Sequence, residues 1–402
     1  MLLDSHDSVD LAVFLSEYWQ KKPLFIKNAF PNFIDFLSPE ELAGLACEDE
    51  VESRLVFSNS SRNSLGWEMK NGPFSEREFT FLPDSQWTLL VQSVDHWLSE
   101  VKSLMQEVAF IPAWRLDDVM VSYAAKGGGV GPHFDYYDVF LIQGQGSRIW
   151  QLGRTCNSST PLDTSSGLKI LEDFIPEQEI ELNTGDALYI PAGMSHCGTA
   201  IEPGMSYSIG FRAPDVAEIL SAYSQLASEN LPQDLRYKDP VITPDDKPGN
   251  IGTSALLQIK ALMQHALDNQ DLLVQCFGRL MTEPRMPELI IPDEEPLRPE
   301  QLVVMLQKGL LLQLHPAARF ACHHHGDTLT MFVNGDSLLF NTPLPDKLSA
   351  LNDELQSATG RVLNLKPFQH NEACLKLLTL LYNQGSVIQT ETSSEDEEYP
   401  HE

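Results

Sequence analysis

Residues 127–138 read GGGVGPHFDYYD, and this stretch decides the expected fold. His133 and Asp135 lie two positions apart in it, directly after a glycine-rich run. On a strand, side chains at positions i and i+2 point to the same side, so an imidazole nitrogen and a carboxylate oxygen can face one ion. Glycine permits a tight turn before these residues and leaves space for a ligand. The stretch therefore predicts two ligands of a metal site on a β-rich scaffold.

A second stretch, GDALYIPAGMSH at residues 185–196, supplies a third ligand. It indicates a turn, a short strand and a Pro-x-Gly turn that ends at His196. Two histidines and one carboxylate form the facial triad that leaves three positions open on non-haem Fe(II). The alternative is a set of ordinary core histidines, but a buried His–Asp pair costs desolvation energy without improving packing. We predict that His133, Asp135 and His196 are the metal ligands and the catalytic residues.

Arg148 lies in the run SRIW at residues 147–150, beside Ile149 and Trp150. A strand with apolar neighbours is an unusual place for a solvated charge. A planar guanidinium inside a barrel is well suited to binding a carboxylate through two hydrogen bonds. We interpret Arg148 as the residue that binds the distal carboxylate of 2-oxoglutarate. The alternative is an arginine whose stem packs on the sheet while its head reaches water or an acid.

Short β runs separated by glycine and proline surround these motifs, a pattern typical of a sandwich or barrel. The expected strands cover residues 119–123, 137–143, 147–152, 178–182, 187–190 and 206–211. Upstream, residues 9–19 have helical spacing, residues 23–26 look extended, and a helix is expected to begin at Pro39. We predict that this first block is a catalytic domain covering residues 1–214.

Two further blocks and a tail follow. Residues 215–284 are predicted to hold two amphipathic helices around a long polar connection, and such a unit is expected to pack on another chain or domain. In residues 285–389 we expect helices near 298–308, 344–357 and 370–382, and strands at 310–321, 328–333 and 337–340. Asn334-Gly335 is a strong hairpin signal there. Helices with a β-hairpin suggest a winged-helix-like domain. Residues 390–402 are acidic and expected to be disordered.

The charge of the chain favours some partners over others. Its 27 Lys and Arg against 57 Asp and Glu give a net charge of −30. Such a surface repels nucleic acid and attracts basic proteins, although many acidic chains are merely soluble. Residues 285–402 carry 8 Lys and Arg against 17 Asp and Glu, so we expect no direct DNA binding by the winged-helix-like domain.

Other features of the sequence favour a cytoplasmic protein. No apolar run is long enough for a membrane span, so no membrane partner is expected. The first residues do not resemble a secretory signal. The six cysteines are scattered without a C-x-x-C pair, which indicates reduced thiols and no zinc ribbon.

The sequence resembles the bacterial JmjC-type ribosomal oxygenases at Gly128 to Trp150, at residues 189–196 and in WQKKPL at residues 19–24. The nearest resemblance is to the arginine hydroxylases that act on large-subunit ribosomal protein sixteen. That family joins a JmjC double-stranded β-helix, a cupin-like jelly roll, to a helical dimerisation region and a C-terminal winged-helix-like domain. The resemblance therefore implies an α+β chain with this layout that forms a homodimer.

The resemblance also implies a reaction. His133, Asp135 and His196 would bind Fe(II), and Arg148 would bind the cosubstrate 2-oxoglutarate. O₂ would be consumed in hydroxylating an arginine β-carbon of a basic ribosomal protein.

Residues close to the metal ligands in sequence are candidates for contacts with the substrate. A substrate arginine needs acids and aromatic rings around it. Because side chains alternate along a strand, not all of the candidates can face one cavity. They are Ser122, Tyr123, Tyr136, Tyr137 and Asp138.

Three alternatives remain open. Relatives in the wider family hydroxylate histidine, a cupin metalloenzyme could use Zn or Mn without 2-oxoglutarate, and a JmjC-like module could bind basic tails without catalysis. The histidine run at residues 323–325 could suggest a second metal site, but three consecutive residues of a strand cannot all face one ion. We expect an exposed hairpin edge there.

Overall fold

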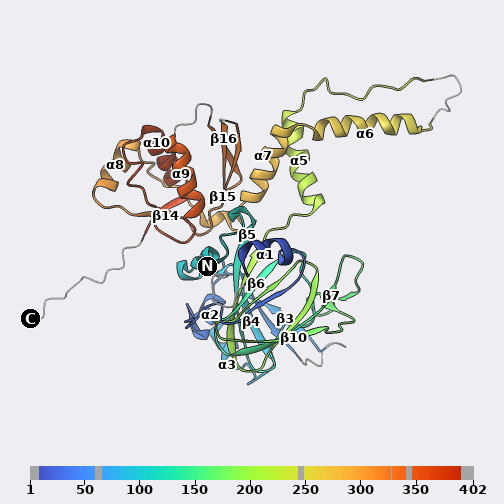
Figure 1. Cartoon of the computed structure of the whole chain (residues 1–402), viewed down its shortest axis with the longest axis vertical. Coiled ribbons are helices and arrows are strands. Elements are labelled where there is room, and N and C mark those ends of the chain that lie inside the picture. Colours follow the sequence, from blue (N-terminus) through green and yellow to red (C-terminus); the bar gives the residue numbers. More distant parts are fainter. Residues whose placement is uncertain (1–8, 59–65, 243–248, 327, 341–345, 391–402) are drawn as a thin grey trace, which may run out of the picture.

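The computed structural model describes residues 9–58, 66–242, 249–326, 328–340 and 346–390. Figure 1 shows a β-rich body, a helical arm drawn in yellow and a C-terminal body drawn in orange and red. None of the helices in the described ranges is long and apolar enough to cross a membrane. The predicted acidic tail lies outside the described residues from Glu391 onward.

Two antiparallel sheets face each other in the β-rich body. The larger has eight strands in the order β1-β11-β6-β13-β5-β4-β2-β3, and the smaller has three in the order β10-β7-β12. This arrangement confirms the predicted double-stranded β-helix. The strands of the larger sheet are β1 (Leu24–Ile26), β2 (Ser53–Phe57), β3 (Glu68–Asn71), β4 (Trp87–Val91), β5 (Leu116–Ala124), β6 (Val139–Gln143), β11 (Ala187–Ile190) and β13 (Gly204–Phe211). Those of the smaller sheet are β7 (Ser147–Thr155), β10 (Gln178–Asn183) and β12 (Met194–Ala200).

The two faces of the larger sheet pack against different partners. One face and the N-terminal helices form the main core, which includes Phe14, Phe140 and Tyr189. The other face and the smaller sheet enclose a second cluster, which includes Leu141 and Trp150. Every residue of β6 is buried, because both of its faces are covered. The short helices around this body are α1 (Leu11–Val13), η1 (Phe14–Tyr18), α2 (Pro39–Leu45), α3 (Glu76–Thr80), η2 (Val94–His96), α4 (Ser99–Ser103), η3 (Leu104–Val108) and η4 (Ala113–Arg115).

Local sequence signals explain where these helices begin. At α2, the Ser38 hydroxyl accepts a hydrogen bond from the Glu41 amide at 3.2 Å, and the Glu41 carboxylate accepts one from the Ser38 amide at 2.7 Å. This capping box, with Pro39 in the first turn, starts the helix where the sequence predicts it. Residues 11–18 are helical as expected, and the Asp10 carboxylate caps α1.

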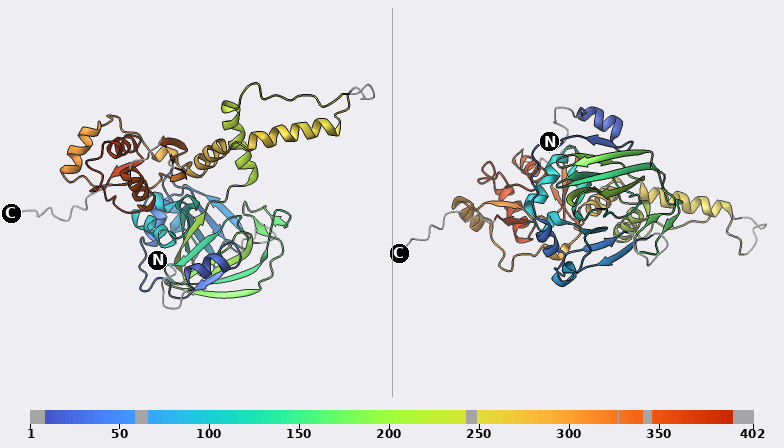
Figure 2. Two further views of the ribbon diagram at one scale, coloured as in Figure 1. Left: turned by 45° about the horizontal axis from the view of Figure 1, so that its top comes forward. Right: turned by 90° about the horizontal axis from the view of Figure 1, so that it is seen from below.

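The helical arm has three helices where two were expected: α5 (Val216–Asn230), α6 (Thr253–Leu267) and α7 (Gln270–Thr282). The missed helix is α7, which starts directly after α6 because the Asn269 side chain accepts a hydrogen bond from the Leu272 amide. Helix α6 has no buried residue, and Figure 2 shows it extending away from the rest of the molecule.

The C-terminal body confirms the predicted helices and hairpin but corrects one strand. The expected strand at 310–321 is two strands, β14 (Leu312–Leu314) and β15 (Phe320–His325), because the chain turns at residues 316–317. β14 pairs with β18 (Val387–Gln389), which was not predicted. Positive φ angles at Asn334 and Gly335 form the turn between β16 (Thr328–Val333) and β17 (Asp336–Phe340). The remaining elements are η5 (Pro287–Leu289), α8 (Pro299–Gln307), α9 (Asp346–Ser357) and α10 (Glu372–Asn383).

The histidine run lies at the end of β15, and all three of its residues are exposed, as expected. Among the described residues, the metal-binding group of three or more side chains does not include this run.

A close contact joins the helical arm to the C-terminal body. Gly278 of α7 lies against the buried ring of Phe332 on β16, and a Cβ atom at Gly278 would lie 2.3 Å from that ring. Gly278→Ala should therefore lower the free energy of unfolding by about 1–3 kcal/mol, although alanine favours a helix. Chemical denaturation followed by circular dichroism measures the change. Gly44→Ala in α2 is the control, because a Cβ atom there meets nothing within 4 Å. Equal stability of the Gly278→Ala variant and the wild type would contradict this packing.

Candidate metal centre

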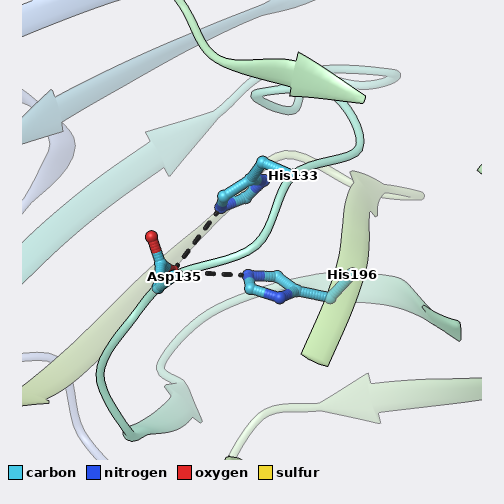
Figure 3. A group of neighbouring side chains, drawn as sticks. All are labelled: His133, Asp135 and His196. Carbon is cyan, nitrogen blue, oxygen red and sulfur yellow. Dashed lines mark ion pairs between the residues drawn. The ribbon is translucent and has the colours of Figure 1, made fainter. Parts of the chain in front are cut away.

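Three side chains converge in the space between the two sheets. The Nε2 atoms of His133 and His196 lie 3.8 and 3.7 Å from Oδ2 of Asp135. One ligand atom from each residue lies within 4.8 Å of the others. Figure 3 shows the three side chains pointing toward one another, with His133 and Asp135 on one loop and His196 on another segment of the chain. A single ion can contact all three, which is the geometry of a facial triad.

Backbone hydrogen bonds hold the two histidines together. The His133 amide donates to the His196 carbonyl at 3.0 Å, and the His196 amide donates to the His133 carbonyl at 2.8 Å. The Gly193 amide donates to the Asp135 carbonyl at 2.6 Å. The expectation that His133 and Asp135 lie on a regular strand is wrong, since His133 forms only an isolated bridge with His196 and β6 begins at Val139. The positive φ of Gly131, followed by Pro132, turns the chain before the ligands.

Each histidine is oriented by its own backbone. Nδ1 of His133 lies 2.9 Å from the Gly131 carbonyl, and Nδ1 of His196 lies 2.9 Å from the Met194 carbonyl. A carbonyl only accepts, so the proton belongs on Nδ1 and the Nε2 lone pair faces Asp135. Burial, together with the neighbouring His133, lowers the pKa of His196 to about 4. A neutral imidazole is the form that binds a metal, so the donor set fits a divalent transition metal.

Arg148 lies in the same cavity without a charged partner. It is 6% exposed, and its Nε and Nη2 atoms are buried with no hydrogen-bond partner. Its guanidinium lies over the Trp150 ring at 5.7 Å from the ring centroid. Burial lowers the pKa of Arg148 to about 10, so the group still carries its charge at neutral pH. A buried, unpaired cation requires an anion, and the distal carboxylate of 2-oxoglutarate fits this requirement.

A cavity of about 480 Å³ connects the triad with Arg148. Ser122, Tyr136 and Tyr137, three of the candidates for substrate contacts, line this cavity. Ser122 is buried on β5, whereas the two tyrosines are 58% and 44% exposed. The wall between these groups is largely apolar and is formed by Leu90, Met120, Val139, Leu141, Trp150 and Ile170.

The structure does not bring two of the candidate residues to the cavity. Tyr123 points to the opposite face of β5, where it joins the main core and its ring lies 5.4 Å from that of Trp87. Asp138 is fully buried and accepts hydrogen bonds from the Tyr189 hydroxyl at 2.6 Å and the Gln20 amide group at 3.2 Å. Strand alternation excludes Tyr123, and Asp138 instead ties the N-terminal segment to the sheet.

Sequence reasoning missed several cavity residues. Thr88 and Arg54 come from strands that the periodicity did not reveal, and Lys169 comes from the hairpin of β8 (Leu162–Asp163) and β9 (Ile170–Leu171). Met120 could have been found, because it lies two positions before Ser122 on the same strand. For Thr88 and Arg54 the chain offers no local signal, since long-range strand pairing brings them to the cavity.

Comparison with known sequences identifies two matching families and several relatives. Residues 103–219 match the family described as JmjC domain, and residues 261–387 match the family described as ROXA-like winged helix. The ribosomal protein uL16 3-hydroxylase of Escherichia coli is 38% identical over 301 residues, which cover 74% of this chain and 78% of that protein. A probable ribosomal oxygenase of Haemophilus influenzae is 40% identical over 215 residues, which cover 53% of this chain and 52% of that protein.

Solved structures extend the similarity to 95% of the chain. The crystal structure of YcfD from Escherichia coli covers 95% of this chain with a TM-score of 0.82 and 33% identity, and 98% of that chain is matched. A structure of YcfD with cobalt and 2-oxoglutarate, described as a ribosomal oxygenase, matches the same shares of both chains at 33% identity with a TM-score of 0.80. With the triad, the paired sheets and these relatives in agreement, the chain belongs to the JmjC-type ribosomal oxygenases.

Proposed function

We propose that this chain is an Fe(II)- and 2-oxoglutarate-dependent hydroxylase that modifies the β-carbon of an arginine in large-subunit ribosomal protein sixteen (uL16). The observation that carries the proposal is one cavity holding both an open His–Asp–His triad and a buried, unpaired arginine. The named activity of the Escherichia coli relative, a uL16 3-hydroxylase, supports the choice of substrate. A cytoplasmic location, where ribosomal proteins are assembled, agrees with this role.

Different residues of the cavity would bind the metal and the cosubstrate. His133, Asp135 and His196 would hold the iron through Nε2, a carboxylate oxygen and Nε2, and Arg148 would hold the distal carboxylate of 2-oxoglutarate. When bound, the iron and its cosubstrate supply the chemistry that couples conversion of 2-oxoglutarate to succinate and CO₂ with insertion of one oxygen atom from O₂ into a C–H bond. The apolar wall excludes water from that chemistry.

The mouth of the cavity suits a basic substrate. Tyr136 and Tyr137 offer exposed aromatic surface beside the triad, and aromatic faces attract guanidinium groups. The net charge of −30 favours encounter with a basic ribosomal protein. Ser122 lies deeper in the cavity, where its hydroxyl can contact the substrate or cosubstrate.

The helical arm supports a homodimer. Helix α6 exposes apolar side chains at helical spacing, among them Leu256, Ile259, Met263 and Leu267. An exposed apolar stripe is unfavourable in water, so we propose that a second copy of this chain packs against it. The acidic balance of the C-terminal block agrees with a structural role there and with no direct contact to DNA.

The proposed reaction has a direct test. A uL16 peptide incubated with the enzyme, Fe(II), 2-oxoglutarate and O₂ should gain one oxygen atom on an arginine, located by tandem mass spectrometry. His133→Ala should lower metal affinity and product formation by about 100-fold or more, because a direct ligand is lost. His324→Ala, on the exposed edge of β15, should act like the wild type. Oxygen on a histidine would change the target residue, and a wild type that forms neither product nor succinate would refute the oxygenase.

The role of Arg148 can be tested by binding alone. Arg148→Met should raise the Kd for 2-oxoglutarate by about 100-fold, because a charge-assisted pair in a buried site is lost. Calorimetric titration of the Mn(II)-loaded protein measures this value without turnover. Arg154→Met is the matched control, since Arg154 lies on the same strand but is exposed. Equal affinity of both variants would contradict the assigned role.

The dimer can be tested by its mass in solution. Light scattering during size-exclusion chromatography should give twice the chain mass of 45.0 kDa for the wild type. Leu256→Glu combined with Met263→Glu should shift this to one chain mass, because two charges would be buried in the interface. Gln264→Glu, which adds a charge to the same helix at an exposed polar position, should leave the dimer intact. A wild type that is monomeric at all concentrations would exclude the homodimer.

A further inference from the structure

Buried polar atoms without partners gather in the cavity. Among the described residues, seven buried side-chain nitrogen or oxygen atoms have no hydrogen-bond partner, and four of these belong to Thr88, Arg148 and Trp150, which all line it. A buried polar group without a partner loses its hydration with nothing to offset the loss. A cluster of such groups in one cavity therefore points to a polar ligand.

Thr88 is the residue of this cluster that lies outside the sequence motifs described above. It lies on β4, is 1% exposed and pairs with Ala124 of β5 and Val56 of β2. Both neighbours are apolar and cannot accept a hydrogen bond through their side chains. Thr88 and Leu90 line the cavity because they are two positions apart on the strand.

The strand pairing brings Thr88 to the same end of the cavity as Arg148. Arg148 pairs with Ala200 of β12. The Ala200 amide donates to the Gly128 carbonyl at 2.9 Å, and a Cβ atom at Gly128 would lie 2.9 Å from the Thr88 hydroxyl oxygen. Thr88 and Arg148 thus flank the same piece of backbone from opposite sheets. His196 lies four residues before Ala200 on β12, toward the opposite end of the cavity.

We propose that the Thr88 hydroxyl and the Arg148 guanidinium together bind the distal carboxylate of 2-oxoglutarate, which makes Thr88 a positioning residue for the cosubstrate. The inference rests on the proposed function, because it takes 2-oxoglutarate as the anion that Arg148 binds. A carboxylate has two oxygens and about four lone pairs, so it can accept from a hydroxyl while it pairs with a guanidinium. The added hydrogen bond holds the cosubstrate at the end away from the metal.

A purely structural role for Thr88 predicts a different outcome. Threonine is favoured in strands because its β-carbon is branched, and valine has nearly the same shape. Replacing Thr88 with valine removes an unpaired buried hydroxyl, so the unliganded protein should be at least as stable as the wild type. If the hydroxyl only fills space, affinity for 2-oxoglutarate does not change. If it binds the carboxylate, affinity falls while stability does not.

The test measures both quantities on the full-length protein loaded with Mn(II). Thr88→Val should raise the Kd for 2-oxoglutarate by about tenfold or more, as expected for a hydrogen bond to a charged group. Thr88→Ser, which keeps the hydroxyl, should stay within about threefold of the wild type, because the donor remains. The melting temperature of the unliganded Thr88→Val variant should equal or exceed that of the wild type. If valine disrupts folding, Thr88→Ala provides the same comparison with a smaller side chain.

Two controls distinguish the role of Thr88 from the assignment of 2-oxoglutarate as the cosubstrate. Thr155→Val makes the same change at an exposed position of β7 and should bind like the wild type. 2-Oxopentanoate lacks the distal carboxylate, so the wild type and Thr88→Val should bind it equally. If Arg148→Met weakens 2-oxoglutarate binding and Thr88→Val does not, the role of Thr88 is refuted alone. If neither variant weakens binding, the cosubstrate assignment is refuted and the role of Thr88 with it.

Discussion

The site depends on one short backbone pairing, the two hydrogen bonds that His133 and His196 exchange. His133 precedes β6 of the larger sheet, and His196 lies on β12 of the smaller sheet. The pairing therefore ties the two sheets together at the position where their ligands meet. Since each imidazole also bonds to a carbonyl two residues earlier, the ring orientation follows from the backbone. The backbone therefore orients the side chains of the triad toward one another.

A buried positive charge is the second constraint. Arg148 has no carboxylate partner among the described residues, although the chain carries 57 Asp and Glu. Asp135 is the acidic residue that lines the cavity, where it faces the two histidines, and Arg148 lies among largely apolar walls. An ion pair formed in such surroundings is stronger than one in water. The molecule thus combines an interior suited to a small dianion with an exterior suited to a basic protein.

The sequence predicted what depends on local signals and missed what depends on long-range pairing. Gly131, Pro132 and the capping residues Ser38 and Glu41 act over a few positions, so the turn before the ligands and the start of α2 could be read directly. Thr88 reaches the cavity only because β4 pairs with β5, and a short apolar strand such as β4 gives no sign of its neighbour. Tyr123 and Asp138 were misjudged because nearness in sequence was used in place of the face on which each side chain lies.

Strand β5 links the cavity to the rest of the chain. Met120 and Ser122 line the cavity in its middle, while its first residues are held by arginines from beyond the helical arm. The Arg319 guanidinium donates to the Leu116 and Asp117 carbonyls at 2.7 Å each, and Arg285 lies 3.5 Å from the Asp118 carboxylate. Asp118 is almost fully buried, and burial raises its pKa, so a nearby cation favours its charged form. The C-terminal block therefore helps to position β5, although none of the described residues of the block lines the cavity. The same strand that carries Met120 and Ser122 into the cavity is thus anchored at its start by the C-terminal block.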